Sequence, residues 1–203
     1  MTEMEWSTCS HPWPMLNHLS RSGLLDDRKL RLFAVACCRR IWFWDEGANY
    51  EKALTRQEQY ADGVVLDDRT RRGTPPFWCF PDGEIVTTDT PGWSFSLMAV
   101  SAAEKDLEDK ELAQWAMLLR DVFGPSPFRH VTIDPSLLKW SDGTVPRIAR
   151  GIYDEKAFGR MGVLADALLD AGCANEEILQ HRREQEQVHV RGCWVLDLLL
   201  GKE

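Results

Sequence analysis

Residues 29–44, KLRLFAVACCRRIWFW, carry the clearest helical pattern in the chain. Apolar side chains recur there at positions i, i+3, i+4, i+7, i+11 and i+14, a spacing that places them on one face of an α-helix. The members of this stripe are Leu30, Phe33, Ala34, Cys37, Ile41 and Trp44. Other apolar residues lie on the opposite side, so we expect neighbouring helices to contact this one from more than one direction. The stretch predicts the central helix of a mostly α-helical protein, with Asp26 or Asp27 as its N-cap.

Similar patterns, bounded by capping residues and glycines, predict the remaining helices. They cover residues 14–19, 49–61, 96–123, 144–153, 160–171, 176–180 and 191–200. Thr144 and Asn175 are the expected N-caps of two of them, and Gly201 is the expected stop of the last. Residues 127–143 lack periodicity and are expected to cross the surface. We therefore predict an irregular helical bundle of about seven helices in one domain, residues 1–203.

Residues 64–95 interrupt the helical pattern with a Pro/Gly-rich insertion. Its prolines exclude a long regular element. Pro81, Asp82 and Gly83 form a turn signal between two short apolar runs, which favours a small β-hairpin of residues 77–80 with residues 84–88. The insertion separates N-terminal helices in residues 1–63 from C-terminal helices in residues 96–203.

The composition is that of an ordinary globular protein. The chain has 203 residues (23.3 kDa), of which 44% are hydrophobic and 28% are charged, and its formal net charge is -8. This acidic balance argues against a nucleic-acid partner, which needs clustered Lys and Arg to neutralise phosphates. No apolar run approaches the roughly 20 residues that cross a bilayer, and the N-terminus lacks the pattern of a signal peptide. The scattered cysteines fit reduced, buried thiols, so we expect a cytoplasmic protein without a membrane partner.

Six segments of the chain carry a family resemblance. They are RKLRLFAVACCRRIW (28–42), LLRDVFG (118–124), PFRHVTID (127–134), IYDEKAF (152–158), VLADALLDAGCANEEIL (163–179) and HVRGCWVLDLLLGKE (189–203). Together they resemble an uncharacterised bacterial family that is found, often in many copies, in large-genome environmental bacteria. Within the fifth segment, ADALLDAG (165–172) is similar to the ADWLEE-x-G core of a short helical repeat-companion module. The resemblance implies a helical, cytosolic protein and implies no activity.

The best candidate metal site lies near the C-terminus. Cys173, His181, His189 and Cys193 offer thiolate and imidazole ligands, which suit tetrahedral Zn²⁺. His189 and Cys193 are four residues apart, so they share one face of a helix if that helix begins early enough. The overall spacing, C-x₇-H-x₇-H-x₃-C, is looser than that of zinc knuckles. The alternative is that both cysteines are buried in the core, while the histidines lie on the surface or form hydrogen bonds.

A second candidate site is basic. Arginines in and near the central helix offer planar forks for a phosphate or a carboxylate. They are Arg28, Arg31, Arg39 and Arg40, and Arg69, Arg71 and Arg72 follow in the insertion. This set predicts a regulator that binds an anion or a nucleic acid. Aspartates flank both groups, so salt bridges explain the arginines equally well, and we favour that explanation.

The sequence gives less support for a catalytic site than for a metal or anion site. Cys9 beside His11, with His18 further along the chain, offers a nucleophile or a ligand, yet no other cation nearby activates it, so a loop cysteine is the simpler interpretation. Asp166 and Asp170 lie one helical turn apart, but nothing in the sequence positions a substrate between them. The chain also lacks a Gly-rich phosphate loop, a nucleophile elbow and an HExxH motif. We therefore name no catalytic residue. An enzymatic function remains an alternative only if Cys173, His181, His189 and Cys193 bind a catalytic metal.

Aromatic residues gather in the insertion. Phe77, Trp78, Phe80 and Trp93 lie in its least regular part, where burial against the core is hardest to arrange. Exposed aromatic side chains of this kind mark protein interfaces, and an internal flap over the helices is the alternative. The principal functional hypothesis is thus a non-catalytic interaction or adaptor protein with an unidentified protein partner. A zinc protein or enzyme and an anion-binding regulator are the alternatives.

Overall fold

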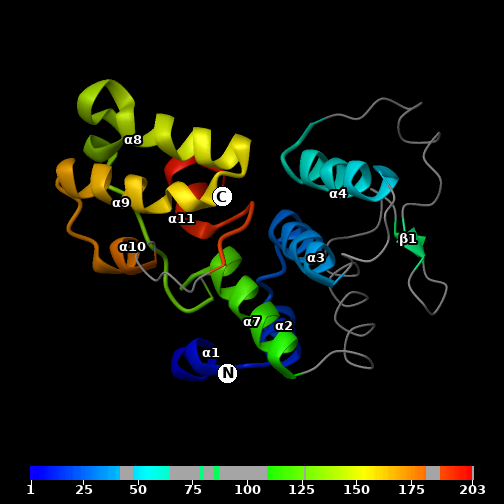
Figure 1. The fold of residues 1–203 in the computed structure, drawn as a ribbon. Helices are drawn as coiled ribbons and strands as arrows, with labels where there is room; N and C mark the ends of the chain where they lie inside the picture. Colours follow the sequence, from blue (N-terminus) through cyan, green and yellow to red (C-terminus); the bar gives the residue numbers. More distant parts are fainter. Residues whose placement is uncertain are drawn as a thin grey trace. The chain divides into compact units, whose positions relative to one another are not determined.

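Figure 1 shows the fold of the chain, taken from a computed structural model. The structure describes residues 1–41, 48–64, 78–79, 85–86, 109–125, 127–181 and 188–202. Within these ranges the chain is mostly α-helical, as the sequence predicts. The chain divides into two compact units, Met1–Leu119 and Arg120–Glu203, where the sequence analysis expects one domain. Helix α7 (Asp109–Phe123) begins in the first unit and ends in the second.

The first unit contains the predicted central helix, α3 (Asp27–Ile41). All residues from position 29 to position 38 are buried, which confirms that neighbours contact this helix on several sides. Asp26 caps it by accepting a hydrogen bond from the backbone N–H of Lys29 at 2.7 Å. Helix α4 (Ala48–Ala61) packs against α3.

Two short helices precede α3. Helix α2 (Pro12–Arg21) extends the predicted helix by about half a turn at each end. Helix α1 (Glu3–Thr8) has no counterpart in the prediction, although Thr2 and Glu5 form a capping box at its start. A helix of six residues is too short to show periodicity, so the sequence pattern does not predict it.

Little of the insertion lies within the described residues. Two short strands, β1 (Trp78–Cys79) and β2 (Ile85–Val86), pair antiparallel with Trp78 opposite Val86. The side chains of the aromatic set Phe77, Trp78, Phe80 and Trp93 lie outside the described part of the structure. The interaction hypothesis that rests on them stays a prediction.

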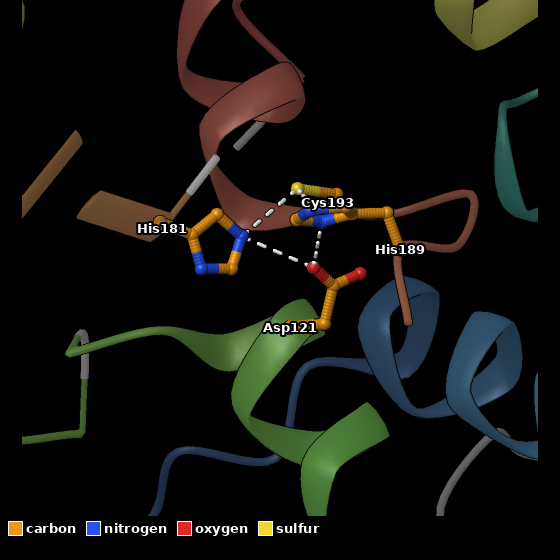
Figure 2. A group of neighbouring side chains, drawn as sticks. All are labelled: Asp121, His181, His189 and Cys193. Carbon is orange, nitrogen blue, oxygen red and sulfur yellow. Dashed lines mark hydrogen bonds and ion pairs between the residues drawn. The ribbon is translucent and has the colours of Figure 1, made fainter. Parts of the chain in front are cut away.

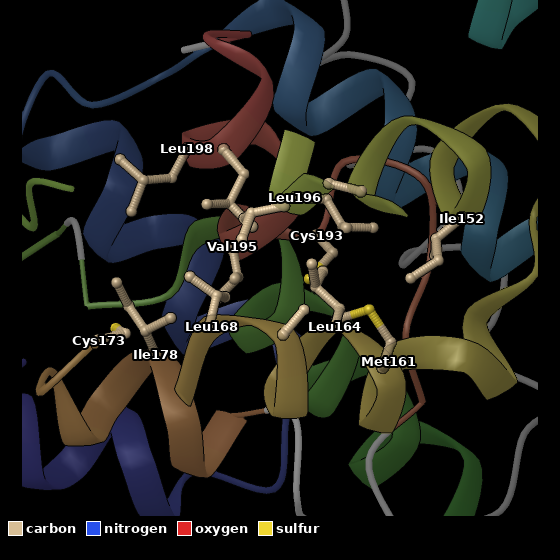
Figure 3. Close-up of a cluster of buried hydrophobic side chains, with 14 of the residues drawn as sticks. Ile152, Met161, Leu164, Leu168, Cys173, Ile178, Cys193, Val195, Leu196 and Leu198 are labelled. Carbon is tan, nitrogen blue, oxygen red and sulfur yellow. The ribbon is translucent and has the colours of Figure 1, made fainter. Parts of the chain in front are cut away.

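The second unit is a separate helical cluster. It consists of α8 (Pro135–Glu155), the 3₁₀ turn η1 (Phe158–Arg160), α9 (Met161–Asp170), α10 (Glu176–His181) and α11 (Trp194–Leu200), with the last turn of α7. Helix α8 packs against both α9 and α11. Figure 3 shows the buried side chains between these helices, among them Leu164, Leu168 and Val195. Burial of this apolar surface is the main stabilising contribution to the unit.

Two predicted helix boundaries in this unit are confirmed. Asn175 caps α10, because its side-chain oxygen accepts hydrogen bonds from the backbone N–H groups of Glu177 and Ile178. Gly201 ends α11 in a left-handed conformation with φ 63°.

The prediction that residues 127–143 only cross the surface is wrong. Helix α8 already begins at Pro135, with Asp134 as its N-cap. Its backbone leaves helical geometry from Trp140 to Gly143 and then resumes. Thr144, the predicted cap of the resumed part, donates its hydroxyl hydrogen to the carbonyl of Ser141 at 2.7 Å. No helix in the described ranges, α8 included, is long and apolar enough to span a membrane.

Candidate metal centre

Four buried side chains of the second unit converge on one point (Figure 2). Asp121 lies in the last turn of α7, His181 is the last residue of α10, and Cys193 directly precedes α11. His189 lies on the segment that leads into α11. One potential ligand atom from each residue lies within 4.8 Å of all the others. We call these four residues the DHHC group.

The interatomic distances in the DHHC group are short. Oδ1 of Asp121 lies 3.0 Å from Nε2 of His181 and 2.8 Å from Nδ1 of His189. Sγ of Cys193 lies 3.3 Å from Nε2 of His181 and 3.9 Å from Nδ1 of His189. The side chains of Asp121 and Cys193 are fully buried, and each imidazole is 7% exposed. The group is therefore a closed polar cluster inside an apolar unit.

Each imidazole directs a single ring nitrogen at both Asp121 and Cys193. Figure 2 shows this for His181, whose Nε2 faces both partners. A catalytic relay needs the two nitrogens of one imidazole to face different partners, one for the orienting carboxylate and one for the nucleophile. Four donor atoms that meet at one centre are instead typical of a metal site.

The distances fit a small tetrahedral metal shell. Metal–nitrogen and metal–oxygen bonds of about 2.0–2.2 Å and a metal–sulfur bond of about 2.3 Å place tetrahedral ligand atoms roughly 3.3–3.7 Å apart. The four distances within the DHHC group run from 2.8 to 3.9 Å. Movements of about half an ångström in the side chains would therefore reach coordination geometry.

The electrostatics of Asp121 depend on the two histidines. Burial alone would raise the pKa of Asp121, but the hydrogen bonds from His181 and His189 outweigh it and lower the pKa. The carboxylate is therefore ionised, and an ionised carboxylate only accepts hydrogen bonds. The ring nitrogen that faces it must carry the hydrogen as long as no metal is bound.

Cys193 has the opposite tendency. Burial and the charge of Asp121 raise the pKa of Cys193 well above its ordinary value. A thiol in this position stays protonated and is a poor nucleophile. A bound cation would reverse this tendency, since a coordinating thiol loses its proton outright.

A tight turn brings His189 and Cys193 together. The backbone N–H of Cys193 donates to the carbonyl of Val190 at 3.0 Å, and Gly192 takes a φ of 91°, which glycine adopts without strain. The turn also directs the backbone N–H of Val190 to Oδ2 of Asp121 at 2.9 Å, which leaves Oδ1 for the histidines. A shared helix face for His189 and Cys193 requires a helix that begins by His189, and α11 begins only at Trp194.

Of the predicted metal ligands, the structure brings together His181, His189 and Cys193 but not Cys173. Cys173 is buried in the apolar cluster of the second unit, near Ile178 and Leu168 in Figure 3. Asp121 provides the fourth potential ligand instead, and the sequence pattern does not predict it. The helix dipole disfavours a carboxylate in the last turn of a helix, but Glu155 ends α8 and Asp170 ends α9 in the same way, so no signal in the sequence singles out Asp121.

The predicted anion set forms ion pairs within the first unit. Each of its four arginines has a carboxylate partner: Arg28 with Asp62, Arg31 with Asp27, Arg39 with Glu51 and Glu58, and Arg40 with Glu111. These contacts favour the salt-bridge interpretation over an anion site. Arg69, Arg71 and Arg72 lie outside the described residues.

The remaining candidate residues lie apart from the DHHC group. Cys9 donates its thiol hydrogen to the carbonyl of His11 at 3.2 Å, and His11 in turn caps α2. His18 packs with its ring against Trp6. Asp166 and Asp170 are exposed on α9. These arrangements give local structural roles to residues that the sequence analysis considered for catalysis.

Comparisons with known proteins give no match for this chain. It matches no family model, no curated protein and no solved structure. The resemblance to a multi-copy bacterial family stays a prediction. The arrangement of the DHHC group is therefore the basis on which function is inferred.

Proposed function

We propose that this protein is a zinc-binding protein and that its ion is structural. One observation carries the proposal: a carboxylate oxygen, two ring nitrogens and a sulfur, each from a buried side chain, meet within 4.8 Å. Thiolate and imidazole together select borderline-soft transition metals over Mg²⁺ and Ca²⁺, which prefer all-oxygen sites. Zn²⁺ is the commonest ion in tetrahedral sites of this mixed type.

The ligand set supports a structural ion over a catalytic one. A catalytic zinc keeps one position for water or substrate and is held by three protein ligands, whereas a structural zinc has four. The DHHC group supplies four, and all are nearly or fully buried. An ion there would cross-link α7, α10 and the start of α11.

The expected consequence is a metal-dependent stability of the second unit. Helices α10 and α11 have six and seven residues, too few to be stable alone. Zinc that binds only the folded chain stabilises it by about 2.7 kcal/mol when free zinc is 100 times the dissociation constant. A chelator removes this contribution.

The test is the metal content of the tag-free protein, measured by mass spectrometry after zinc loading and desalting. We expect one zinc per chain, and a Co²⁺-loaded sample with the absorption of a tetrahedral thiolate site. Cys193→Ser is expected to lose the metal. Cys173→Ser is the matched control, since it alters a second buried cysteine of the same unit that lies outside the DHHC group.

Two results would contradict the proposal. One is wild-type protein that holds no zinc after loading. The other is equal zinc content in the Cys193→Ser and Cys173→Ser variants, which would mean that the metal binds elsewhere. Binding of Cu²⁺ above Zn²⁺ in vitro would contradict neither, since most nitrogen and sulfur sites show that order.

A further inference from the structure

Gly124, three residues after Asp121, lies directly on the indole ring of Trp194. Its φ is +55°, and a Cβ atom built there would lie 2.5–2.7 Å from Cγ, Cδ1 and Cδ2 of that ring. Carbon atoms pack at about 3.5–4.0 Å, so no side chain fits between this backbone and the indole. The atoms in contact belong to the base of the ring, which cannot swing aside as the tip of a flexible side chain can.

The same indole also packs against a member of the DHHC group. Trp194 follows Cys193 in the chain, and its ring centroid lies 5.2 Å from that of His181 at an interplanar angle of 53°. His181 in turn meets the ring of His189 edge-on at 5.0 Å. Trp194 is 6% exposed, so its position is fixed by packing on all sides. One ring therefore packs against both Gly124, which directly follows α7, and the imidazole of His181.

We propose that Gly124 and Trp194 are positioning residues that set the metal affinity of the DHHC group. This inference rests on the proposed zinc site and adds to it two residues that are not ligands but hold the ligands in place. The indole packs against His181, and the missing side chain at position 124 lets the end of α7 pack on the same ring closely enough for Asp121 to reach His181. Metal sites tolerate only about 0.2 Å of error in ligand distances. A shift in the packing of Gly124 on Trp194 therefore weakens binding although every ligand is present.

Two other glycines that follow helices differ from Gly124 in the space around them. Gly201 ends α11 with φ +63° and Gly172 follows α9 with φ +89°, yet a Cβ at either position would meet nothing within 4 Å. Alanine at these positions carries the backbone strain of a positive φ and no clash. Gly201 therefore provides a matched control in the same unit, with nearly the same φ as Gly124.

The experiment compares the zinc dissociation constants of Gly124→Ala and Gly201→Ala, measured by competition with a chromophoric chelator. Outer residues that hold ligands in place typically change metal affinity by 10- to 100-fold. We expect Gly124→Ala to weaken zinc binding at least tenfold and Gly201→Ala to change it less than twofold. Urea unfolding in excess chelator measures the fold stability of both variants separately from zinc binding.

A double variant tests the contact between Gly124 and Trp194 directly. Trp194→Leu removes the ring that Gly124 contacts, so Gly124→Ala is expected to have little further effect on affinity in that background. Trp194→Leu alone is expected to weaken zinc binding at least tenfold. Trp140→Leu is its control, because Trp140 packs against the same apolar cluster and belongs to a different helix. These two variants carry the test if Gly124→Ala does not fold.

The outcomes distinguish this inference from the proposed function. A wild-type protein without zinc would overturn the metal site itself. Wild-type zinc binding with unchanged affinity in Gly124→Ala or Trp194→Leu would overturn only the positioning role. Equal losses in Gly124→Ala and Gly201→Ala would also overturn it, because backbone strain alone would then explain the effect.

Discussion

Buried polar groups occur in both units, but their charges are balanced in different ways. In the first unit, Arg39 pairs with Glu58, and Arg31 donates to the side chain of Gln57 at 2.6 Å. Burial alone would lower the pKa of Arg39, yet hydrogen bonds and charge from Glu58 and Glu51 outweigh it and raise the pKa. Charge in this unit is thus offset by a guanidinium that is always ionised.

In the second unit, the buried carboxylate of Asp121 has no such partner among the described residues. Asp121 faces two imidazoles and a backbone N–H, none of which carries a permanent positive charge. The difference teaches how to separate structural ion pairs from a ligand site. Where permanent opposite charges are already paired, no ligand is needed. Where nitrogen and sulfur atoms that can coordinate a metal surround a single negative charge, the site suits a bound cation.

Asp121→Ala is the largest test of this comparison. It removes the acceptor of hydrogen bonds from His181, His189 and Val190, so buried donors lose their partner. We expect the stability of the second unit to fall by roughly 1–3 kcal/mol for each buried donor left without an acceptor, and zinc binding to be lost. Hydrogen exchange measured by mass spectrometry would locate the change in α10 and α11.

The control for Asp121→Ala is Asp166→Ala, which removes an exposed acid from α9 in the same unit. Exposed substitutions of this kind change stability by about 0.5 kcal/mol or less. Similar effects of the two variants would show that Asp121 has no special environment. Retained zinc in Asp121→Ala would remove it from the ligand set.

A smaller effect is expected from Glu58→Gln in the first unit. Glu58 is buried against Arg39, and loss of its charge is expected to lower stability by about 1.5–3 kcal/mol. The loss must be the same with zinc and with chelator, because this ion pair needs no ligand. Thermal unfolding under both conditions measures it.

The matched control for Glu58→Gln is Glu51→Gln, which alters the other carboxylate on Arg39. The Glu51 side chain is 60% exposed, so its substitution is expected to lower stability by less than about 1 kcal/mol. A zinc-dependent effect at Glu58 would undermine the comparison between the units.

Asn175→Ala is expected to have the smallest effect. It removes the N-cap of α10, the helix that carries His181, and lowers stability by about 1 kcal/mol. Zinc affinity is expected to fall by no more than about fivefold, which is the same free energy expressed as a binding constant. Asn17→Ala on the exposed side of α2 is the control and should be neutral. A larger fall in affinity would mean that α10 depends on its cap more than on packing.

The sequence predicted those parts of the fold that depend on local pattern. The apolar stripe identified α3, Asn175 marked the start of α10, and Gly201 marked the end of α11. The kink in α8 was not predictable, because Ser141 and Asp142 adopt left-handed conformations that few non-glycine residues favour. Such conformations are imposed by the surrounding packing.

The candidate site was predictable where its ligands lie close together in the chain. His181, His189 and Cys193 were identified by residue type and proximity. Asp121 lies far earlier in the sequence and joins them only through tertiary packing. Cys173 has suitable chemistry, but its neighbours are apolar. Residue type names possible ligands, and only the fold decides which of them meet.

The large separation of Asp121 from the other three ligands has a consequence for protein synthesis. At about 5–20 residues per second, the chain between Asp121 and Cys193 takes roughly 4–14 s to translate. For most of that time the last turn of α7 presents a carboxylate without its histidines, because the first of them, His181, follows Asp121 by 60 residues. In the zinc site that we propose, all four ligands can hold the ion only once Cys193 has left the ribosome.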